Sequence, residues 1–137
     1  GLSVLGECAV LVDCDVMDAD GGTRTAAITG SWVALCLAAQ KLKTEIPNLA
    51  KAIEVSQPVA AISVGMVEGD PCLDLPYVED RDAEVDMNVV MTADNRLVEV
   101  QGTAESKPFT REEMDKLLSL AEIGLKELFE IQKKVLQ

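Results

Sequence analysis

Two glycines, a threonine and an arginine stand together where a strand pattern gives way to a helix pattern. Gly21 and Gly22 precede Thr23 and Arg24, and glycine lets the backbone turn tightly and approach a ligand closely. The first turn of a helix offers unpaired N–H groups and the positive end of its dipole. An arginine guanidinium can grip phosphate or carboxylate with two donors. The segment predicts an anion site for phosphate, with a plain strand-to-helix turn as the alternative.

A second candidate is the acidic segment that runs from Glu79 to Asp86. Such a charge run is commonly a solvated turn, and that interpretation stays open for most of it. Asp86 differs because it lies in a strand pattern between Val85 and Met87, and alternation places it on the face opposite to those apolar side chains. With Asp80 close by, it could share a Mg²⁺ ion, whose preferred ligands are hard oxygens from carboxylates, water and phosphate.

Length and composition restrict the class of protein. The chain has 137 residues, of which 48% are hydrophobic and 3% aromatic, so we expect a globular domain with an aliphatic core. No apolar run is long enough to cross a membrane and no signal peptide is evident. The net charge of −12 repels nucleic acid, so an RNA partner would need a local basic groove or one on another chain.

The cysteines and the absence of histidine exclude several chemistries. Cys8, Cys14, Cys36 and Cys72 are widely spaced and the chain contains no histidine, which argues against a zinc site. The apolar surroundings of the cysteines suit reduced thiols in a cytoplasmic protein. Without histidine there is no usual general base, so catalysis would depend on carboxylates, Lys, Arg, backbone N–H groups or a metal.

The remaining pattern predicts an α+β layer with helices on one face of a mostly antiparallel sheet. The apolar run 58–67 and the alternating runs 9–16, 85–91 and 97–102 predict strands, and a turn at Gly69 predicts a return strand over 72–75. Residues 26–43 predict a largely buried helix, residues 49–55 a short one and residues 77–84 an acidic connection. Thr110 and Glu113 form a capping box that begins the last helix.

The sequence resembles the ribonuclease PH family over essentially its whole length. The similar segments include the two candidate sites and residues on both sides of each. The most specific segments are 20–25 and 100–105. The full set is 5–7, 13–16, 19–26, 28–30, 33–35, 63–65, 74–75, 77–80, 84–91, 98–105 and 108–109. The resemblance implies the ribosomal-protein-S5-domain-2-like fold of that family. It divides the chain into 1–57, the end of a first domain with the phosphate loop and helix, and 58–137, a C-terminal domain.

The resemblance implies a phosphate-dependent 3′→5′ exoribonuclease, a tRNA nucleotidyltransferase that trims tRNA precursor 3′ ends and releases nucleoside diphosphates. Phosphate binding maps to Gly22, Thr23 and Arg24. The essential acidic pair of the family maps to Asp80 and Asp86, as Mg²⁺ ligands or as charge stabilisers, with Arg24 as the third catalytic residue. These groups are expected to meet across one cavity. Mg²⁺ is the implied cofactor and inorganic phosphate the co-substrate.

Two departures from the family pattern affect the expected partners. Family members are much longer, so the chain matches a C-terminal half, and its first residue, Gly1 rather than Met, favours a processed chain or a fragment. Cys8 stands where the family has arginine. The implied partners are a hexameric ring of dimers of the same chain, or a complementary N-terminal half, with no membrane. A catalytically silent ring subunit and a generic acidic binding module are the alternatives.

Overall fold

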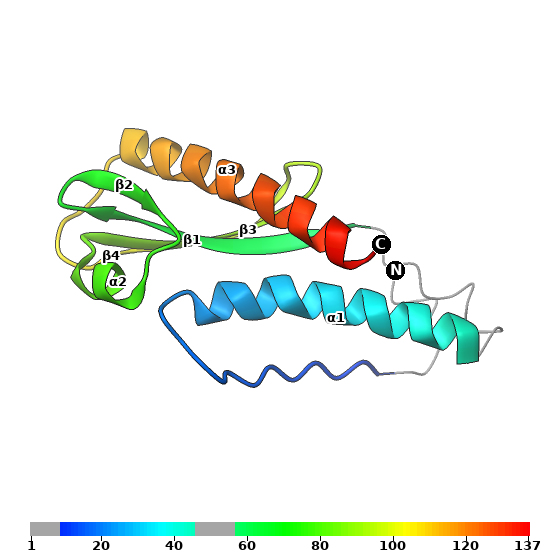
Figure 1. The fold of residues 1–137 in the computed structure, drawn as a ribbon. Coiled ribbons are helices and arrows are strands. Elements are labelled where there is room, and N and C mark those ends of the chain that lie inside the picture. The colour runs from blue at the N-terminus through cyan, green and yellow to red at the C-terminus, as the bar shows by residue number, and fades with distance from the viewer. Residues whose placement is uncertain (1–8, 46–56) are drawn as a thin grey trace.

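A computed structural model describes residues 9–45 and 57–137. It contains three helices and four strands (Figure 1). In chain order they are α1 Thr23–Glu45, β1 Val59–Val67, β2 Asp70–Leu73, α2 Tyr77–Asp82, β3 Val85–Thr92, β4 Leu97–Ala104 and α3 Arg111–Val135. The short helix expected over 49–55 lies outside the described residues.

The four strands form one antiparallel sheet in the order β2-β1-β3-β4, which confirms the predicted fold class. β1 and β2 are joined by a turn in which Glu68 and Gly69 both have positive φ, 52° and 85°, as a tight hairpin requires. The return strand starts two residues earlier than expected, at Asp70, and the acidic connection contains the short helix α2. The elements after residue 57 therefore follow the sequence pattern closely.

The core lies between α3 and one face of the sheet. Alternate residues of β1 and β3 point toward α3 and are almost fully buried, together with Leu117, Ala121 and Leu125 of the helix. The capping box is present: the Thr110 hydroxyl accepts from the Glu113 amide at 3.2 Å, and the Glu113 carboxylate accepts from the Thr110 amide at 2.6 Å. This start aligns the apolar stripe of α3 with the sheet from its first turn.

The helix α1 lies along the open half of the β1 edge, on the other side of that strand from α3 (Figure 1). β2 pairs with β1 only over Val64–Val67, so the first half of β1 has an unpaired edge. The Thr29 hydroxyl covers it by accepting from the Ala61 amide at 3.0 Å and donating to the Ala61 carbonyl at 3.1 Å. The Gln132 amide of α3 donates to the carbonyls of Thr29 and Val59. These bonds join both long helices to one strand.

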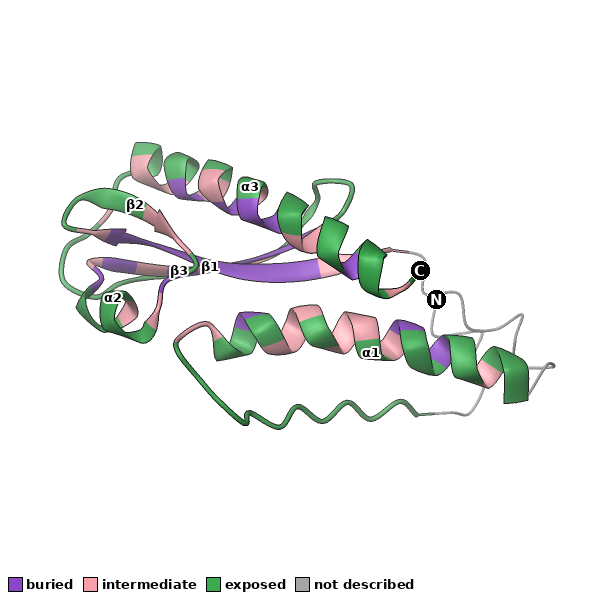
Figure 2. Cartoon of the chain, viewed as in Figure 1, coloured by how far each residue is buried: buried purple, intermediate pink, exposed green. Residues whose placement is uncertain are grey.

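Two expectations for the first part of the chain were wrong. Residues 9–16 form no strand with any described residue and are exposed (Figure 2). They run beside α1, where the Cys14 thiol lies 3.2 Å from the Ser31 hydroxyl. Alternation is not sufficient for a strand, because a strand also needs a partner strand, and residues 9–16 lie beside α1 and pair with no strand of the described sheet. The helix α1 is also less buried than expected, since Thr25, Cys36 and Ala39 are its only buried residues.

Candidate functional site

The glycine loop before α1 is held against the segment that begins α2. The Asp20 carboxylate accepts from the Tyr77 amide at 3.0 Å. Gly21 has φ 80°, and a Cβ on it would lie 2.4 Å from the Leu75 carbonyl oxygen. Leu75 in turn covers Gly65 of β1, where an added Cβ would lie 2.6 Å from the leucine side chain. Glycine at both places lets the loop, Leu75 and the sheet stack closely, which brings the predicted phosphate loop to the sheet.

The first turn of α1 is organised around Gly22 and Thr25. Gly22 has φ 59°, and its carbonyl accepts from the Thr25 hydroxyl at 2.7 Å and from the Ala26 amide at 2.9 Å. Thr25 is buried, whereas Thr23 and Arg24 are exposed. Of the four residues in the predicted anion site, the two glycines therefore shape the turn, and Thr23 and Arg24 present their side chains to solvent where a ligand can reach them.

Arg24 reaches across to the far edge strand. Its Nη2 donates to the Glu99 carboxylate of β4, at 2.8 Å from one oxygen and 3.0 Å from the other. Both side chains are about half exposed, at 49% and 40%, so the ion pair contributes little to stability by itself. The pair shows that the guanidinium faces the sheet surface that α3 leaves uncovered. It also shows that a carboxylate of this chain occupies the donor that an anion would use.

The sheet face on the Arg24 side is largely polar, because the register places the polar residues of three strands in rows. Asp86 pairs with Thr103, and Asn88 lies between Ser63 and Gln101. Glu99 pairs with Val90 on the same face, since directly opposed residues of antiparallel strands share a face. Four residues of β3 separate the Val90 and Asp86 levels, or about 13 Å at the rise of a strand. Arg24 therefore meets one end of this polar face and Asp86 lies at the other.

Asp80 lies near enough to Asp86 for its charge to act on the titration of that carboxylate. Burial, the Asp80 carboxylate and the Glu105 carboxylate raise the pKa of Asp86, while a backbone hydrogen bond from Met87 opposes the rise. A partly buried carboxylate beside two others has an unfavourable negative charge, and a divalent cation would relieve it. No set of three or more candidate metal ligands exists within residues 9–45 and 57–137. Any cation at this pair would need water or substrate oxygens to complete its shell, as Mg²⁺ sites commonly do.

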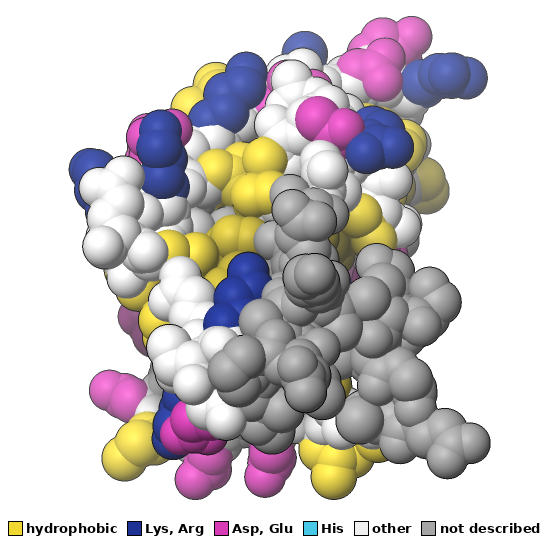
Figure 3. Space-filling view, turned by 90° about the vertical axis from the view of Figure 1, so that its right-hand side faces the viewer, with side chains coloured by type: hydrophobic (Ala, Val, Ile, Leu, Met, Phe, Trp, Pro, Cys, Tyr) yellow, Lys and Arg dark blue, Asp and Glu magenta, His cyan; other side chains and the backbone are white. Residues whose placement is uncertain are grey.

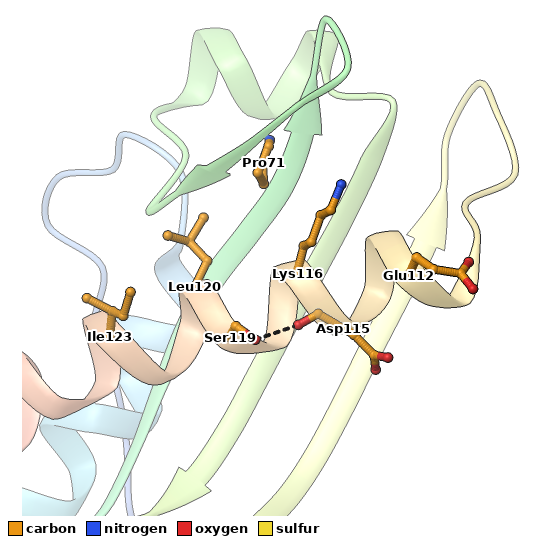
Figure 4. A pocket seen from close by; sticks show the side chains of 7 residues that line it. All are labelled: Pro71, Glu112, Asp115, Lys116, Ser119, Leu120 and Ile123. Atoms are coloured by element: carbon orange, nitrogen blue, oxygen red, sulfur yellow. Dashed lines mark hydrogen bonds between the residues drawn. The ribbon is translucent and has the colours of Figure 1, made fainter.

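Two hollows in the described part of the molecule lie away from the predicted site residues. A hollow of about 430 Å³ lies on the flank of α3 that faces β2, lined by Pro71, Lys116, Leu120 and Ile123 among others (Figure 4). A second hollow of similar volume has Trp32 and Phe129 in its lining. It lies at the end of the molecule that faces the viewer in Figure 3. Neither hollow is lined by a predicted site residue.

Sequence reasoning identified the glycine loop and the acidic pair but not the groups between them. Asn88 lies on the Asp86 face by alternation along β3, but an asparagine in a strand does not by itself indicate a site. Glu99 is 75 residues from its partner Arg24, and no local pattern connects them. Ser63 stands in a nearly continuous apolar run, where a lone serine gives no signal. These residues become neighbours only through strand pairing.

Among the described residues, no helix is long and apolar enough to span a membrane.

Comparison with known proteins links this arrangement to one family. Residues 57–124 match the family model described as 3′ exoribonuclease family, domain 2. The chain is 53% identical over 135 residues to proteins named ribonuclease PH from Syntrophomonas wolfei and Corynebacterium efficiens. The matches cover 98% of this chain but 56% and 54% of those relatives. The chain thus spans about half the length of the curated relatives that it matches.

A solved structure supports the fold independently. The crystal structure of rice (Oryza sativa) Rrp46 superposes with a TM-score of 0.68 at 18% sequence identity. The match covers 89% of this chain and 51% of the rice chain. At this identity the similarity concerns the fold.

Proposed function

This chain belongs to the 3′ exoribonuclease family as the counterpart of the C-terminal half of ribonuclease PH, and on that premise we propose that it carries the phosphate and metal groups of a phosphorolytic 3′→5′ exoribonuclease. The substrate is the 3′ end of a tRNA precursor. The observation that carries the proposal is one polar sheet face with Arg24 over one end and Asp80 and Asp86 at the other.

The chemistry needs little from the protein beyond positioning and charge neutralisation. Arg24 and the N–H groups of the first turn of α1 hold inorganic phosphate through charge-assisted hydrogen bonds. A phosphate oxygen forms a bond to the phosphorus of the terminal phosphodiester, and the bond from that phosphorus to the 3′ oxygen of the preceding nucleotide breaks. The leaving oxygen takes up a proton as the new 3′ hydroxyl, and the terminal nucleotide departs as a nucleoside 5′-diphosphate.

Asp80 and Asp86 are the residues that would hold Mg²⁺. When bound, the ion neutralises negative charge on the phosphate oxygens, as divalent ions do in phosphoryl transfer. Their own role is to keep two carboxylates side by side at the Thr103 end of the polar face. The raised pKa of Asp86 supports this assignment, because a cation restores its ionised form.

The proposal includes a partner for the RNA. The chain has a net charge of −12, so the basic surface that follows an RNA backbone would come from other copies of the chain or from a complementary N-terminal half. A hexameric ring of dimers is the proposed assembly. The free thiols of Cys14, Cys36 and Cys72 support a location in the cytoplasm.

The decisive experiment follows nucleoside diphosphate release from a tRNA precursor carrying a 3′-terminal label, with and without inorganic phosphate, on the chain in its native assembly. Release should require phosphate, and Arg24→Ala should lower it on the order of a hundredfold or more, because a charge-stabilising donor is lost. Arg111→Ala, which removes an arginine from the exposed first turn of α3, is the matched control and should retain full activity. Equal release without phosphate would identify a hydrolase and overturn the proposal.

A catalytically silent subunit would give a different result in binding. Titration calorimetry of the chain with phosphate and with Mg²⁺ should show both ligands binding, with Arg24→Ala weakening phosphate and Asp86→Asn weakening Mg²⁺. A silent subunit should bind neither ligand.

A further inference from the structure

Residues 9–17 run along α1 with their main chain unpaired (Figure 1). None of their main-chain N–H or C=O groups is hydrogen bonded to the main chain of another described residue. The Cys14 thiol, 3.2 Å from the Ser31 hydroxyl, faces the helix, whereas Leu11 and Met17 are 94% and 95% exposed. An extended segment with free main-chain groups offers an edge to which another strand can add.

The helix α1 lacks the charged face of a helix that borders water. No charged residue occurs between Arg24 and Lys41, although charged residues make up 26% of the chain. Ala34, Leu37 and Ala38 in this uncharged stretch are nevertheless exposed, Leu37 at 46%. A surface helix normally carries charged side chains on the face away from the core, and a helix without such a face is normally buried. The composition of α1 is therefore that of a helix covered on both sides.

The segment and the exposed side of the helix form one continuous surface. Ser31, which contacts Cys14, is followed three and seven positions later by Ala34 and Ala38, the spacing of one helix face. The segment therefore borders the side of α1 on which these two residues are exposed. Contiguous apolar patches of this kind mark interaction sites in soluble proteins. We call this region the segment–helix surface, made of residues 9–17 and the exposed residues of α1 from Ala34 to Ala38.

Charge argues against a second copy of the chain as the occupant of this surface. Positions 13–20 hold four aspartates and no basic residue, and two such segments paired side by side would oppose like charges. Each copy also carries a net charge of −12.

The lengths of the relatives favour a different occupant. The matches to the two ribonuclease PH proteins cover 98% of this chain but only 56% and 54% of those proteins. The relatives therefore contain the counterpart of the segment–helix surface together with a further portion of almost equal length. That portion is large enough to supply a sheet and a covering face.

We infer that residues 9–16 add as a strand to a sheet of the N-terminal portion of the ribonuclease PH fold, and that this portion covers the exposed side of α1. The helix is then covered on both sides, as its composition requires. The partner strand should carry Lys or Arg opposite Asp13 and Asp15, because opposite charges across a strand pair are favourable. The inference rests on the proposed function only in taking the partner from the same family, and it requires no catalysis.

The test is coexpression of the full chain with the part of the Syntrophomonas wolfei protein that precedes the matched region. Native mass spectrometry should show a one-to-one complex. Hydrogen–deuterium exchange should show that the amides of residues 9–16 exchange rapidly in the chain alone and at least about tenfold more slowly in the complex, because strand pairing protects them. The amides at the end of α3 are the internal reference and should be unchanged.

Variants of the segment–helix surface separate docking from structural damage. Leu11→Asp and Ala34→Glu each place a charge on the surface, and each should weaken the complex at least about tenfold, because an unpaired charge would be buried. The melting temperature of the uncomplexed chain should not change, since both side chains are exposed. Ile123→Asp, at an apolar residue of α3 that is 55% exposed, is the matched control and should bind as the wild type does.

A fusion of the same Syntrophomonas wolfei part to Gly1 gives an answer even if that part does not fold as a separate chain. Amides of residues 9–16 that exchange as fast in the fusion as in the chain alone would overturn the inference. So would a complex that leaves these amides unprotected, or a dimer of the chain alone that protects them.

The outcomes also separate this inference from the proposed function. A complex that protects residues 9–16 but releases no nucleoside diphosphate from RNA with phosphate present would keep the docking surface and overturn the function. Phosphate-dependent release without that protection would keep the function and overturn the docking surface.

Discussion

The Arg24 guanidinium and the Glu99 carboxylate are joined at 2.8 Å across the polar face of the sheet. The pair connects the first turn of α1 with β4 and orients the arginine over that face. It also places a negative group of the chain where the proposed phosphate would bind. The Glu99 carboxylate therefore positions Arg24 to bind an anion and also competes with that anion for the guanidinium.

Removing the charge of Glu99 should strengthen phosphate binding. A carboxylate and a phosphate compete for the same donors, so Glu99→Gln should lower the dissociation constant for inorganic phosphate several-fold, as measured by calorimetry. The free energy of unfolding should change by less than about 0.5 kcal/mol, because the ion pair is exposed. Glu122→Gln, which removes a half-exposed carboxylate paired with Lys126 on α3, is the control. Weaker phosphate binding in Glu99→Gln would mean that the carboxylate only orients Arg24.

The raised pKa of Asp86 makes stability depend on pH in a defined direction. Its pKa lies above the ordinary value of 3.8 because of burial, Asp80 and Glu105. The folded state therefore holds the proton more tightly than the unfolded state, and this contribution to stability is complete below pH 3.8 and is lost as the pH rises through the raised value. Asp86→Asn should raise the melting temperature at pH 7 without Mg²⁺, and the difference from wild type should vanish in acid.

Glu113 provides an internal comparison of opposite sign. Hydrogen bonds from the backbone and side chain of Thr110 lower the pKa of Glu113, so its contribution is present above its ordinary value of 4.5 and is lost as the pH falls. Glu113→Gln should therefore lower the melting temperature at pH 7 and approach wild type in acid. An Asp86→Asn variant that is less stable than wild type at pH 7 would contradict the repulsion inferred at the acidic pair.

The close contact at Gly21 should make that position much less tolerant than Gly69. Both glycines have positive φ, at 80° and 85°, but only Gly21 faces a backbone oxygen, whereas an added Cβ on Gly69 meets no described atom within 4 Å. Gly69→Ala should cost about 1–2 kcal/mol for its left-handed conformation. Gly21→Ala should cost about 1–3 kcal/mol more because it is overpacked against Leu75. Urea denaturation of the two variants measures the difference, and equal losses would show that the loop yields easily.

The Thr29 hydroxyl should contribute more to the free energy of unfolding than the hydroxyl of an ordinary helix threonine. It satisfies both backbone groups of Ala61 on the open edge of β1, so Thr29→Val should cost about 1–3 kcal/mol by leaving them unpaired. Phosphate binding should weaken as well, since α1 carries Arg24. Thr44→Val, which removes an exposed hydroxyl bonded to the Lys41 carbonyl, should cost less than about 0.5 kcal/mol. Equal costs for the two variants would mean that water replaces the hydroxyl at the edge of β1.

The sequence by itself determined the elements whose physics is local. The capping box at Thr110, the apolar stripe of α3, the alternation of β3 and the glycine loop before α1 are set by residues a few positions apart, and each appears as predicted. The same local patterns identified Arg24, Asp80 and Asp86 as candidates, and the family motifs assigned their roles.

Only the tertiary structure decided what depends on partners distant in the chain. The alternating run 9–16 is a strand only if it pairs with a sheet edge, and in the described fold it lies beside α1 instead. The ion pair of Arg24 with Glu99 and the row through Asn88 exist because strand register aligns residues that are tens of positions apart. A one-residue change of register would move those side chains to the other face, and no local pattern carries that information.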